Sequence, residues 1–254
     1  MKGALVIVTG AASGIGAAAV ERFAADGARV LAFDRGLCGD DAVRDGVVAL
    51  QGDVTRQADV DRLIAKASEL GGLRAVVNAA GVVAADDPED VEDATWDRML
   101  AVNLTGTMRV CRGAIPLLRA SGGGAVVNVA SVAAFNSTPG SASYAPSKAG
   151  VVAYTRSIAY AHGPEGIRAN CLCPGWTRTA MAEAEMKEAA AQAGTDAEHE
   201  FAALAARLAL RRLARPAEMA ACIRFLAGDE ASFVTGAVLV ADGGGRIAAG
   251  ARGF

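Results

Sequence analysis

Apolar residues along the chain form short unbroken runs, separated by longer stretches in which apolar residues recur every three or four positions. The first run, "ALVIV" at residues 4–8, is rich in branched side chains and predicts a strand buried on both faces. Similar runs predict strands at residues 28–34, 47–54, 74–81, 125–131, 167–175 and 237–244. The periodic stretches predict helices at residues 15–27, 57–72, 95–121, 144–164 and 216–228.

Regular alternation of strand and helix predicts an α/β fold with a doubly wound parallel sheet, arranged as three αβα layers. Residues 180–212 interrupt this rhythm with two alanine-rich amphipathic pieces around "AGTD". The sequence has no internal repeat, low-complexity tail or proline-rich linker. We therefore predict one domain over residues 1–254, with residues 180–212 as a lid.

Composition and charge narrow the classes of protein to consider. The chain has 254 residues, 52% of them hydrophobic, with 30 glycines, which suits a compact fold with many tight turns. A net charge of -3 gives no broad attraction to nucleic acid or to anionic lipid, so neither is an expected partner. The apolar start is too short for a signal peptide or membrane span, and a cytoplasmic location is expected.

The five cysteines are odd in number and lack the paired spacing of metal ligands, so no metal site is predicted. Cys171 and Cys173 form C-x-C inside a predicted strand. Alternate residues of a strand face the same side, which predicts two small buried thiols there. A reducing compartment is the default for such a chain.

Residues 9–16, "TGAASGIG", place three spaced glycines between the first predicted strand and the first predicted helix. Gly10 allows a tight turn, Gly14 lets backbone approach a pyrophosphate, and Gly16 permits close helix packing. The helix N-terminus adds unpaired N–H groups and a partial positive charge. Ordinary turn glycines are the alternative, but the strand and helix around them favour a dinucleotide site.

Asp34 ends the second predicted strand, 18 residues after Gly16. A carboxylate at this point accepts hydrogen bonds from the adenosine ribose hydroxyls and repels a 2′-phosphate, which predicts NAD rather than NADP. The neighbouring Arg35 partly offsets that repulsion. A solvated turn residue is the alternative for Asp34.

Tyr144 and Lys148 stand four residues apart in "SYAPSKAG" and share one face of a predicted helix. A free tyrosine has a pKa of about 10, too high for an efficient base near neutrality. A unit charge 4 Å away contributes about 4 kcal/mol at an effective dielectric constant of about 20. An ammonium beside the hydroxyl, together with an oxidised nicotinamide, is therefore expected to lower the pKa of Tyr144. A pair of surface residues is the alternative.

Several short motifs follow one another along the chain: "TGAASGIG" (9–16), "GDVT" (52–55), "NAAG" (78–81), "AVNLTG" (101–106), "NVAS" (128–131), "YAPSK" (144–148) and "PGWTRT" (174–179). With these motifs in this order the chain resembles the short-chain dehydrogenases/reductases over essentially its whole length. The resemblance implies a Rossmann-type domain that uses NAD(H) or NADP(H) to interconvert an alcohol and a carbonyl. It also implies a homotetramer or homodimer, paired through the helices at 95–121 and 144–164.

The resemblance implies a dinucleotide site drawn from most of these motifs. Its residues would be Gly10, Ser13, Gly14, Ile15, Gly16, Asp34, Asp53, Val54, Asn78, Ala79, Ala80, Gly81, Tyr144, Lys148, Pro174, Gly175, Thr177 and Thr179. Asp53 and Val54 would lie near the adenine, and Thr179 would hold the nicotinamide carboxamide. Ala79 departs from the second asparagine usual in the family, so one side-chain hydrogen bond would be missing.

The resemblance also implies four catalytic residues, Asn103, Ser131, Tyr144 and Lys148. Tyr144 would remove or return the proton of the alcohol, and Ser131 would hydrogen-bond the substrate oxygen. Lys148 would hold the nicotinamide ribose, and Asn103 would hold a water that relays protons through Lys148. Ala130 stands where many relatives have a first serine.

The substrate is expected to be a secondary alcohol or ketone of moderate polarity. Candidate pocket residues are Met181, Met186, Phe201, Leu204 and Leu208 in the lid, with Phe135, Asn136, Ser137 and Trp176 as walls. Ordinary helical packing is the alternative for the lid. Arg178 is a candidate partner for an acidic substrate group, with a solvated arginine as the alternative.

Two other functions remain open. One is an NADPH-dependent 3-oxoacyl thioester reductase of the same family, which Asp34 disfavours. The other is a non-catalytic dinucleotide-binding sensor, which the presence of Ser131, Tyr144 and Lys148 disfavours.

Overall fold

The centre of the fold is one eight-stranded sheet, seen in a computed structural model that describes residues 1–37, 42–44, 46–137 and 140–245. The strands are β1 (Leu5–Thr9), β2 (Arg29–Asp34), β3 (Ala42–Arg44), β4 (Val47–Gln51), β5 (Leu73–Asn78), β6 (Gly124–Val129), β7 (Ile167–Pro174) and β8 (Val238–Ala241). Their spatial order is β3-β4-β2-β1-β5-β6-β7-β8. Cys38 and residues 246–254, which the sequence analysis included, lie outside the described residues.

All neighbouring strands pair in parallel except β3, which pairs antiparallel with β4 at the sheet edge. The predicted doubly wound parallel sheet is confirmed. The sequence did not predict β3, because a three-residue strand is too short to show the alternating pattern of a longer one.

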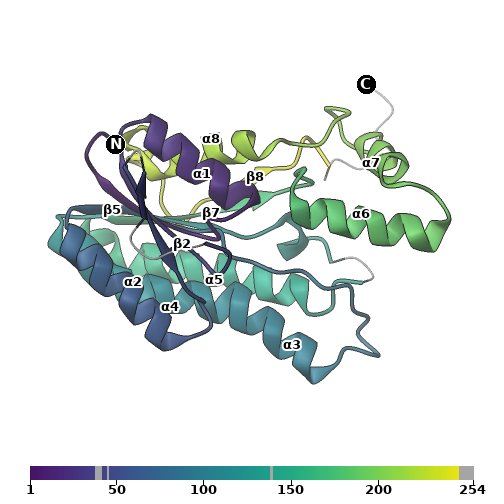
Figure 1. Ribbon diagram of the computed structural model, residues 1–254, viewed down its shortest axis with the longest axis horizontal. Helices are drawn as coiled ribbons and strands as arrows, with labels where there is room; N and C mark the ends of the chain where they lie inside the picture. The colour runs from purple at the N-terminus through teal and green to yellow at the C-terminus, as the bar shows by residue number, and fades with distance from the viewer. Residues whose placement is uncertain (38–41, 45, 138–139, 246–254) are drawn as a thin grey trace.

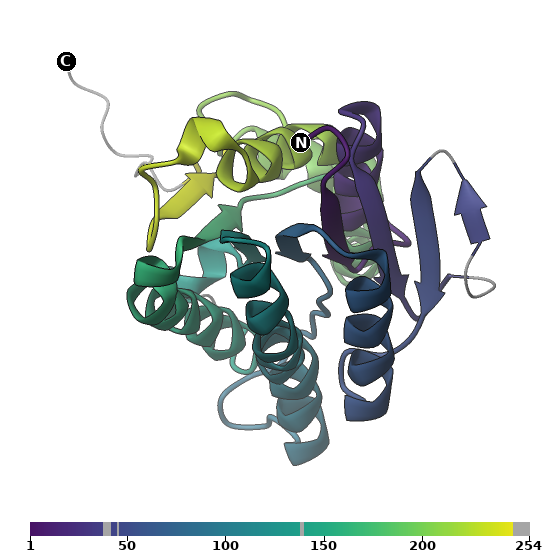
Figure 2. The same cartoon turned by 90° about the vertical axis from the view of Figure 1, so that its left-hand side faces the viewer.

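Helices cover both faces of the sheet. They are α1 (Gly14–Ala25), α2 (Gln57–Leu70), α3 (Asp93–Met99), α4 (Thr107–Ala120), α5 (Tyr144–His162), α6 (Ala180–Ala193), α7 (Ala197–Ala205) and α8 (Pro216–Ala227). Figures 1 and 2 show α1 and α8 on one face and α2, α4 and α5 on the other. No described helix is long and apolar enough to cross a membrane.

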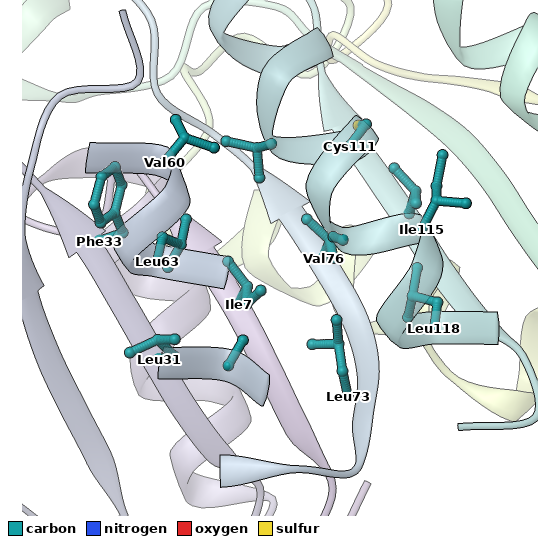
Figure 3. Packing of buried hydrophobic residues seen from close by; sticks show 14 of the residues in the cluster. Ile7, Leu31, Phe33, Val60, Leu63, Leu73, Val76, Cys111, Ile115 and Leu118 are labelled. Atoms are coloured by element: carbon teal, nitrogen blue, oxygen red, sulfur yellow. The ribbon is translucent and has the colours of Figure 1, made fainter. Parts of the chain in front are cut away.

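Alternate residues of each central strand pack into two separate hydrophobic cores, one on each face of the sheet. In β1, Ile7 packs toward α2 and α4 with Phe33, while Val8 packs toward α1 and α8. Figure 3 shows Leu63 of α2 and neighbouring side chains above the first of these faces. Burial on both faces explains why the strand sequences are continuously apolar. The predicted thiols at Cys171 and Cys173 are also buried, and both pack on α5.

The helix predicted over residues 95–121 is a continuous helical segment of three parts. Between α3 and α4 lies a π-helical stretch, η1 (Leu100–Gly106). An extra residue in one turn leaves the apolar pattern almost unchanged, so the sequence did not reveal it. π-Helical turns often occur at functional sites, and this one contains Asn103.

The sheet reverses its winding direction between β1 and β5. From β1 the chain moves outward to β2 and β4, and then returns to β5 on the other side of β1. Ligands of open α/β sheets bind beyond the carboxyl ends of the strands at such a reversal. The loops after β1 and β5 are therefore where a site is expected.

Candidate active site

A cavity of about 300 Å³ opens at the carboxyl ends of β1, β2, β4 and β5. It is lined by Gly10, Ser13, Gly14, Ile15, Gly16, Phe33, Asp34, Arg35, Gly52, Asp53, Val54, Ala79, Ala80, Gly81, Val82, Val102, Thr179 and Met181. Most of the residues predicted for the dinucleotide are thus brought together. The others, Asn78, Tyr144, Lys148, Pro174, Gly175 and Thr177, do not line this cavity.

The glycine loop packs directly on the loop that follows β5. Gly10 has φ of +70°, and a Cβ there would lie 2.6 Å from the carbonyl of Ala79. A Cβ at Gly16 would lie 2.0 Å from the carbonyl oxygen of Gly10. Hydrogen atoms in place of side chains therefore let the two loops and the start of α1 meet backbone to backbone.

Three charged side chains occupy the β2 end of the cavity. The Asp34 carboxylate accepts hydrogen bonds from the N–H of Ala12 at 3.3 Å and of Gly36 at 2.8 Å. The Arg35 guanidinium forms an ion pair with Asp53 at 3.7 Å. Two carboxylates and one guanidinium leave this end of the cavity with a net negative charge.

Asn78 lies at the end of β5, but its side chain turns into the core. Its Nδ2 donates to Oδ1 of Asn128 at 2.8 Å and to Sγ of Cys111 at 3.2 Å. Asn128 in turn donates to Thr155 of α5 at 2.9 Å. These buried bonds connect β5, β6 and α5 beneath the cavity.

The loop after β7 closes over the glycine loop through Thr179. A Cβ at Gly14 would lie 3.2 Å from Cγ2 of Thr179. Oγ1 of Thr179 accepts the N–H of Ala182 and begins α6. Nearby, Gly175 donates to the carbonyl of Ala241, and Thr177 is buried. These bonds fix the loop at the edge of the cavity.

Tyr144, Ser131 and Lys148 meet where β6 and α5 face each other. Tyr144 is the first residue of α5, and the Ser131 side chain lies close enough to lower the pKa of its hydroxyl. Oγ of Ser131 also accepts the N–H of Ala133 at 3.1 Å. Lys148 Nζ lies 5.7 Å from the centre of the Tyr144 ring and donates to the carbonyl of Val129.

The pKa of Tyr144 in the polypeptide by itself lies above its ordinary value. It is raised to about 12, chiefly by burial; the Ser131 side chain acts to lower it, and the Glu185 carboxylate contributes to the rise. Burial also lowers the pKa of Lys148 to about 8. The lowered pKa expected with an oxidised nicotinamide stays a prediction, since in the polypeptide alone the cost of burying a phenolate dominates.

Asn103 is buried and links three segments of the site. Its Oδ1 accepts the N–H of Val82 at 2.9 Å, and its Nδ2 donates to the carbonyl of Val82 and to Oγ of Ser147. A Cβ at Gly81 would lie 3.3 Å from both Asn103 Oδ1 and Lys148 Nζ. The amide and the ammonium therefore converge beside Gly81.

Some residues of the predicted lid pack against one another in a buried cluster, and one lines the cavity. Met186 and Phe201 are buried against each other, with Leu204 and Trp176 beside them. Leu208 is buried as well. Met181 is 39% exposed and lines the cavity.

Arg178 connects the loop after β7 to both lid helices. It forms ion pairs with Glu183 of α6 and Glu198 of α7, and its guanidinium lies 4.5 Å from the centre of the Phe201 ring. Glu185 lies one turn beyond Met181 on α6 and is partly buried. It was not anticipated, although its i,i+4 spacing from Met181 is visible in the sequence.

Parallel α/β folds with a glycine loop at the reversal of the sheet and an acid ending the second strand form a class of dinucleotide-binding proteins. Comparison of the sequence with known proteins identifies the family within that class. The family described as Enoyl-(Acyl carrier protein) reductase matches residues 10–245. The chain belongs to the short-chain dehydrogenase/reductase family, whose members are oxidoreductases that use nicotinamide dinucleotides.

Individual relatives are similar over nearly the whole chain. Cis-4-hydroxycyclohexanecarboxylate dehydrogenase of Sinomonas cyclohexanicum is 39% identical over 94% of this chain and 95% of its own length. A 3-oxoacyl-[acyl-carrier-protein] reductase of Thermotoga maritima is 33% identical over 96% of this chain and 98% of its own length. The ligand-free aldohexose dehydrogenase of Thermoplasma acidophilum superimposes with a TM-score of 0.88 at 33% identity, covering 98% of this chain and 96% of that one.

Replacing Gly10 with alanine is expected to impair both folding and dinucleotide binding, because a Cβ would collide with the backbone of Ala79. Gly122→Ala is a matched control, since Gly122 has φ of +78° but nothing within 4 Å of its Cβ position. The control should lose about 1–2 kcal/mol of unfolding free energy from backbone strain alone. Gly10→Ala should lose more and bind the dinucleotide at least about ten-fold more weakly. Denaturant titration and calorimetry measure both, and equal behaviour of the two variants would contradict the close loop packing.

Proposed function

We propose that the protein is an NAD-dependent oxidoreductase that interconverts a secondary alcohol and a ketone, with Tyr144 as general acid and base. The observation that carries this proposal is the meeting of Tyr144, Ser131 and Lys148 beside the dinucleotide-type cavity. The residues that line the cavity fit a dinucleotide, because bare backbone at Gly10 and Gly16 and the N-terminus of α1 favour close approach of a pyrophosphate.

When bound, a nicotinamide ring supplies or accepts the hydride and, when oxidised, adds a positive charge that favours the phenolate form of Tyr144. Ser131 holds the substrate oxygen in hydrogen-bond reach of the tyrosine hydroxyl. Tyr144 then takes the proton of an alcohol or returns one to a ketone. Lys148 and Asn103, which converge beside Gly81, are proposed to pass that proton toward solvent through a water.

The charges at the β2 end of the cavity support NAD rather than NADP. Arg35 is paired with Asp53, so its guanidinium is already balanced. Asp34 leaves a net negative charge close to where the adenosine ribose is proposed to lie. A 2′-phosphate would add further negative charge there and lose free energy by repulsion.

Residues 180–212 are proposed to form the lid over the substrate. Thr179 and Met181 line the cavity where α6 begins, while Met186 and Phe201 stabilise the lid from within. Because Arg178 is balanced by Glu183 and Glu198, it is not proposed as a partner for an acidic substrate.

An NADPH-dependent 3-oxoacyl thioester reductase is the second candidate, supported by the similarity to the Thermotoga maritima reductase. Activity on an acyl thioester with NADPH that exceeds activity on alcohols with NAD would favour it.

The proposed assembly is a homotetramer or homodimer paired through α4 and α5. Tyr160 of α5 is 93% exposed in the single chain. Sedimentation velocity would reveal a monomer instead.

Replacing Tyr144 with phenylalanine should lower kcat by about a thousand-fold or more, because the proton donor and acceptor is lost. NAD affinity and unfolding free energy should stay close to those of the unaltered chain. Steady-state oxidation of a panel of secondary alcohols, followed by nicotinamide absorbance, measures the effect. Tyr154→Phe, in the same helix, is the control. An active Tyr144→Phe enzyme would remove the proposed chemistry, and absence of turnover in the unaltered chain would favour the sensor alternative.

Replacing Asp34 with alanine should shift cofactor preference toward NADP, because the carboxylate that repels the 2′-phosphate is removed. The ratio of kcat/KM for NAD to that for NADP should exceed one in the unaltered chain and fall by about ten-fold or more in the variant. Asp61→Ala, which removes an exposed carboxylate of α2 remote from the cavity lining, is the control. An unaltered chain that prefers NADP would refute the cofactor assignment.

Replacing Glu185 with glutamine should move the pH dependence of alcohol oxidation to lower pH. The Glu185 carboxylate raises the pKa of Tyr144, so removing its charge lets the tyrosine lose its proton at lower pH. Glu188→Gln removes a charge from the next turn of α6 and should leave the profile in place. The pH profile of kcat, measured with saturating NAD, tests this, and coincident profiles for all three proteins would contradict it.

A further inference from the structure

The catalytic helix α5 begins without a cap of its own. Tyr144 is its first residue, its first turn holds no acidic side chain, and the Ser143 side chain accepts no hydrogen bond from the helix. The first N–H groups of a helix lack partners within the helix, and a negative charge beside them is stabilising. The position of Tyr144 therefore depends on groups outside α5.

Asp86, in the loop after β5, supplies the missing carboxylate. Its Oδ1 accepts the N–H of Ser143 at 3.1 Å, and its Oδ2 accepts a hydrogen bond from the Ser143 hydroxyl. Ser143 has no solvent exposure. Both oxygens of one carboxylate thus hold the residue immediately before Tyr144, in a place where water competes little.

The backbone around Asp86 keeps this carboxylate in place. The N–H of Asp86 donates to the carbonyl of Gly140 at 3.3 Å, and the N–H of Ala142 donates to the carbonyl of Asp86 at 3.3 Å. The loop after β5 is therefore paired with the segment that leads into α5. These bonds hold the backbone of Asp86 beside the residues that precede Ser143.

The same loop reaches α5 a second time through Asn103. The backbone of Val82 binds the Asn103 amide, Asn103 donates to Oγ of Ser147, and that hydroxyl donates to the carbonyl of Tyr144 at 2.6 Å. Tyr144 thus lies between two connections from one loop. One connection holds the residue before it, and the other holds its own carbonyl.

We infer that Asp86 is a positioning residue for the proposed reaction, holding the first turn of α5 through Ser143 so that the Tyr144 hydroxyl faces Ser131. This inference rests on the proposed function of Tyr144. A displacement of about 1 Å at a reacting group can cost about a hundred-fold in rate, so the contact between Asp86 and Ser143 bears on kcat rather than on affinity.

The test compares Asp86→Ala with Asp87→Ala, which removes the next carboxylate of the same loop. Asp87 is exposed, and its Oδ1 accepts only the N–H of Glu89 among the described residues. In Asp86→Ala we expect kcat for alcohol oxidation to fall by about ten- to a hundred-fold, with the KM of the alcohol and the affinity for NAD changed by less than about two-fold. Asp87→Ala should match the unaltered chain.

Two further variants separate positioning from a loss of folding. Asp86→Asn keeps an oxygen that accepts from Ser143 and should recover part of the lost kcat. Ser143→Ala removes only the hydroxyl contact and should lower kcat less than Asp86→Ala. Should Asp86→Ala fail to fold, these two variants carry the test.

Amide hydrogen exchange provides a measurement independent of turnover. Exchange at the amides of Tyr144, Ala145 and Ser147 should quicken in Asp86→Ala, while exchange at residues 152–158 in the middle of α5 should not change. Unchanged exchange, unchanged kcat, or a rise in KM at constant kcat would each overturn the inference. If the unaltered chain oxidises no alcohol with either dinucleotide, the proposed function fails, whereas the exchange data still decide whether Asp86 holds α5.

Discussion

The close contact between the loops after β1 and β5 is the constraint on which the site depends. Parallel pairing of the two strands brings Gly10 against the backbone of Ala79, at a distance that leaves no room for a side chain. From this contact the first loop continues into α1 and the second continues through Val82 to Asp86. The cavity and the support of Tyr144 therefore originate in the same backbone approach.

The pKa of Tyr144 depends on two opposing effects, burial and nearby positive charge. The position of the tyrosine beside Ser131 requires partial removal from water, and burial raises the pKa to about 12 in the chain alone. Lys148 is buried as well, which lowers its own pKa to about 8. Further positive charge beside a buried phenol favours its phenolate form, and an oxidised nicotinamide would supply such a charge in the proposed reaction.

The sequence predicted the parts of this protein that depend on local pattern. Continuous apolar runs predicted the parallel strands, and the ordered motifs predicted the family. It did not identify the π-helical turn at Asn103, because one extra residue hardly changes helical periodicity. It did not show that the Asn78 side chain binds Asn128 in the core, since the face of a strand-end residue depends on packing. Asp86 and Glu185 act through contacts across the fold, which no local pattern records.

Supporting a catalytic residue from outside its own helix has a physical consequence. The first turn of a helix is the part most easily lost, because its N–H groups have no partners within the helix. A side-chain cap from the same helix would secure the turn but would not fix it relative to the strand that carries Ser131. A carboxylate from the β5 loop does both, since β5 pairs directly with β6 in the sheet. The distance between Ser131 and Tyr144 is thereby determined by the sheet rather than by α5 alone.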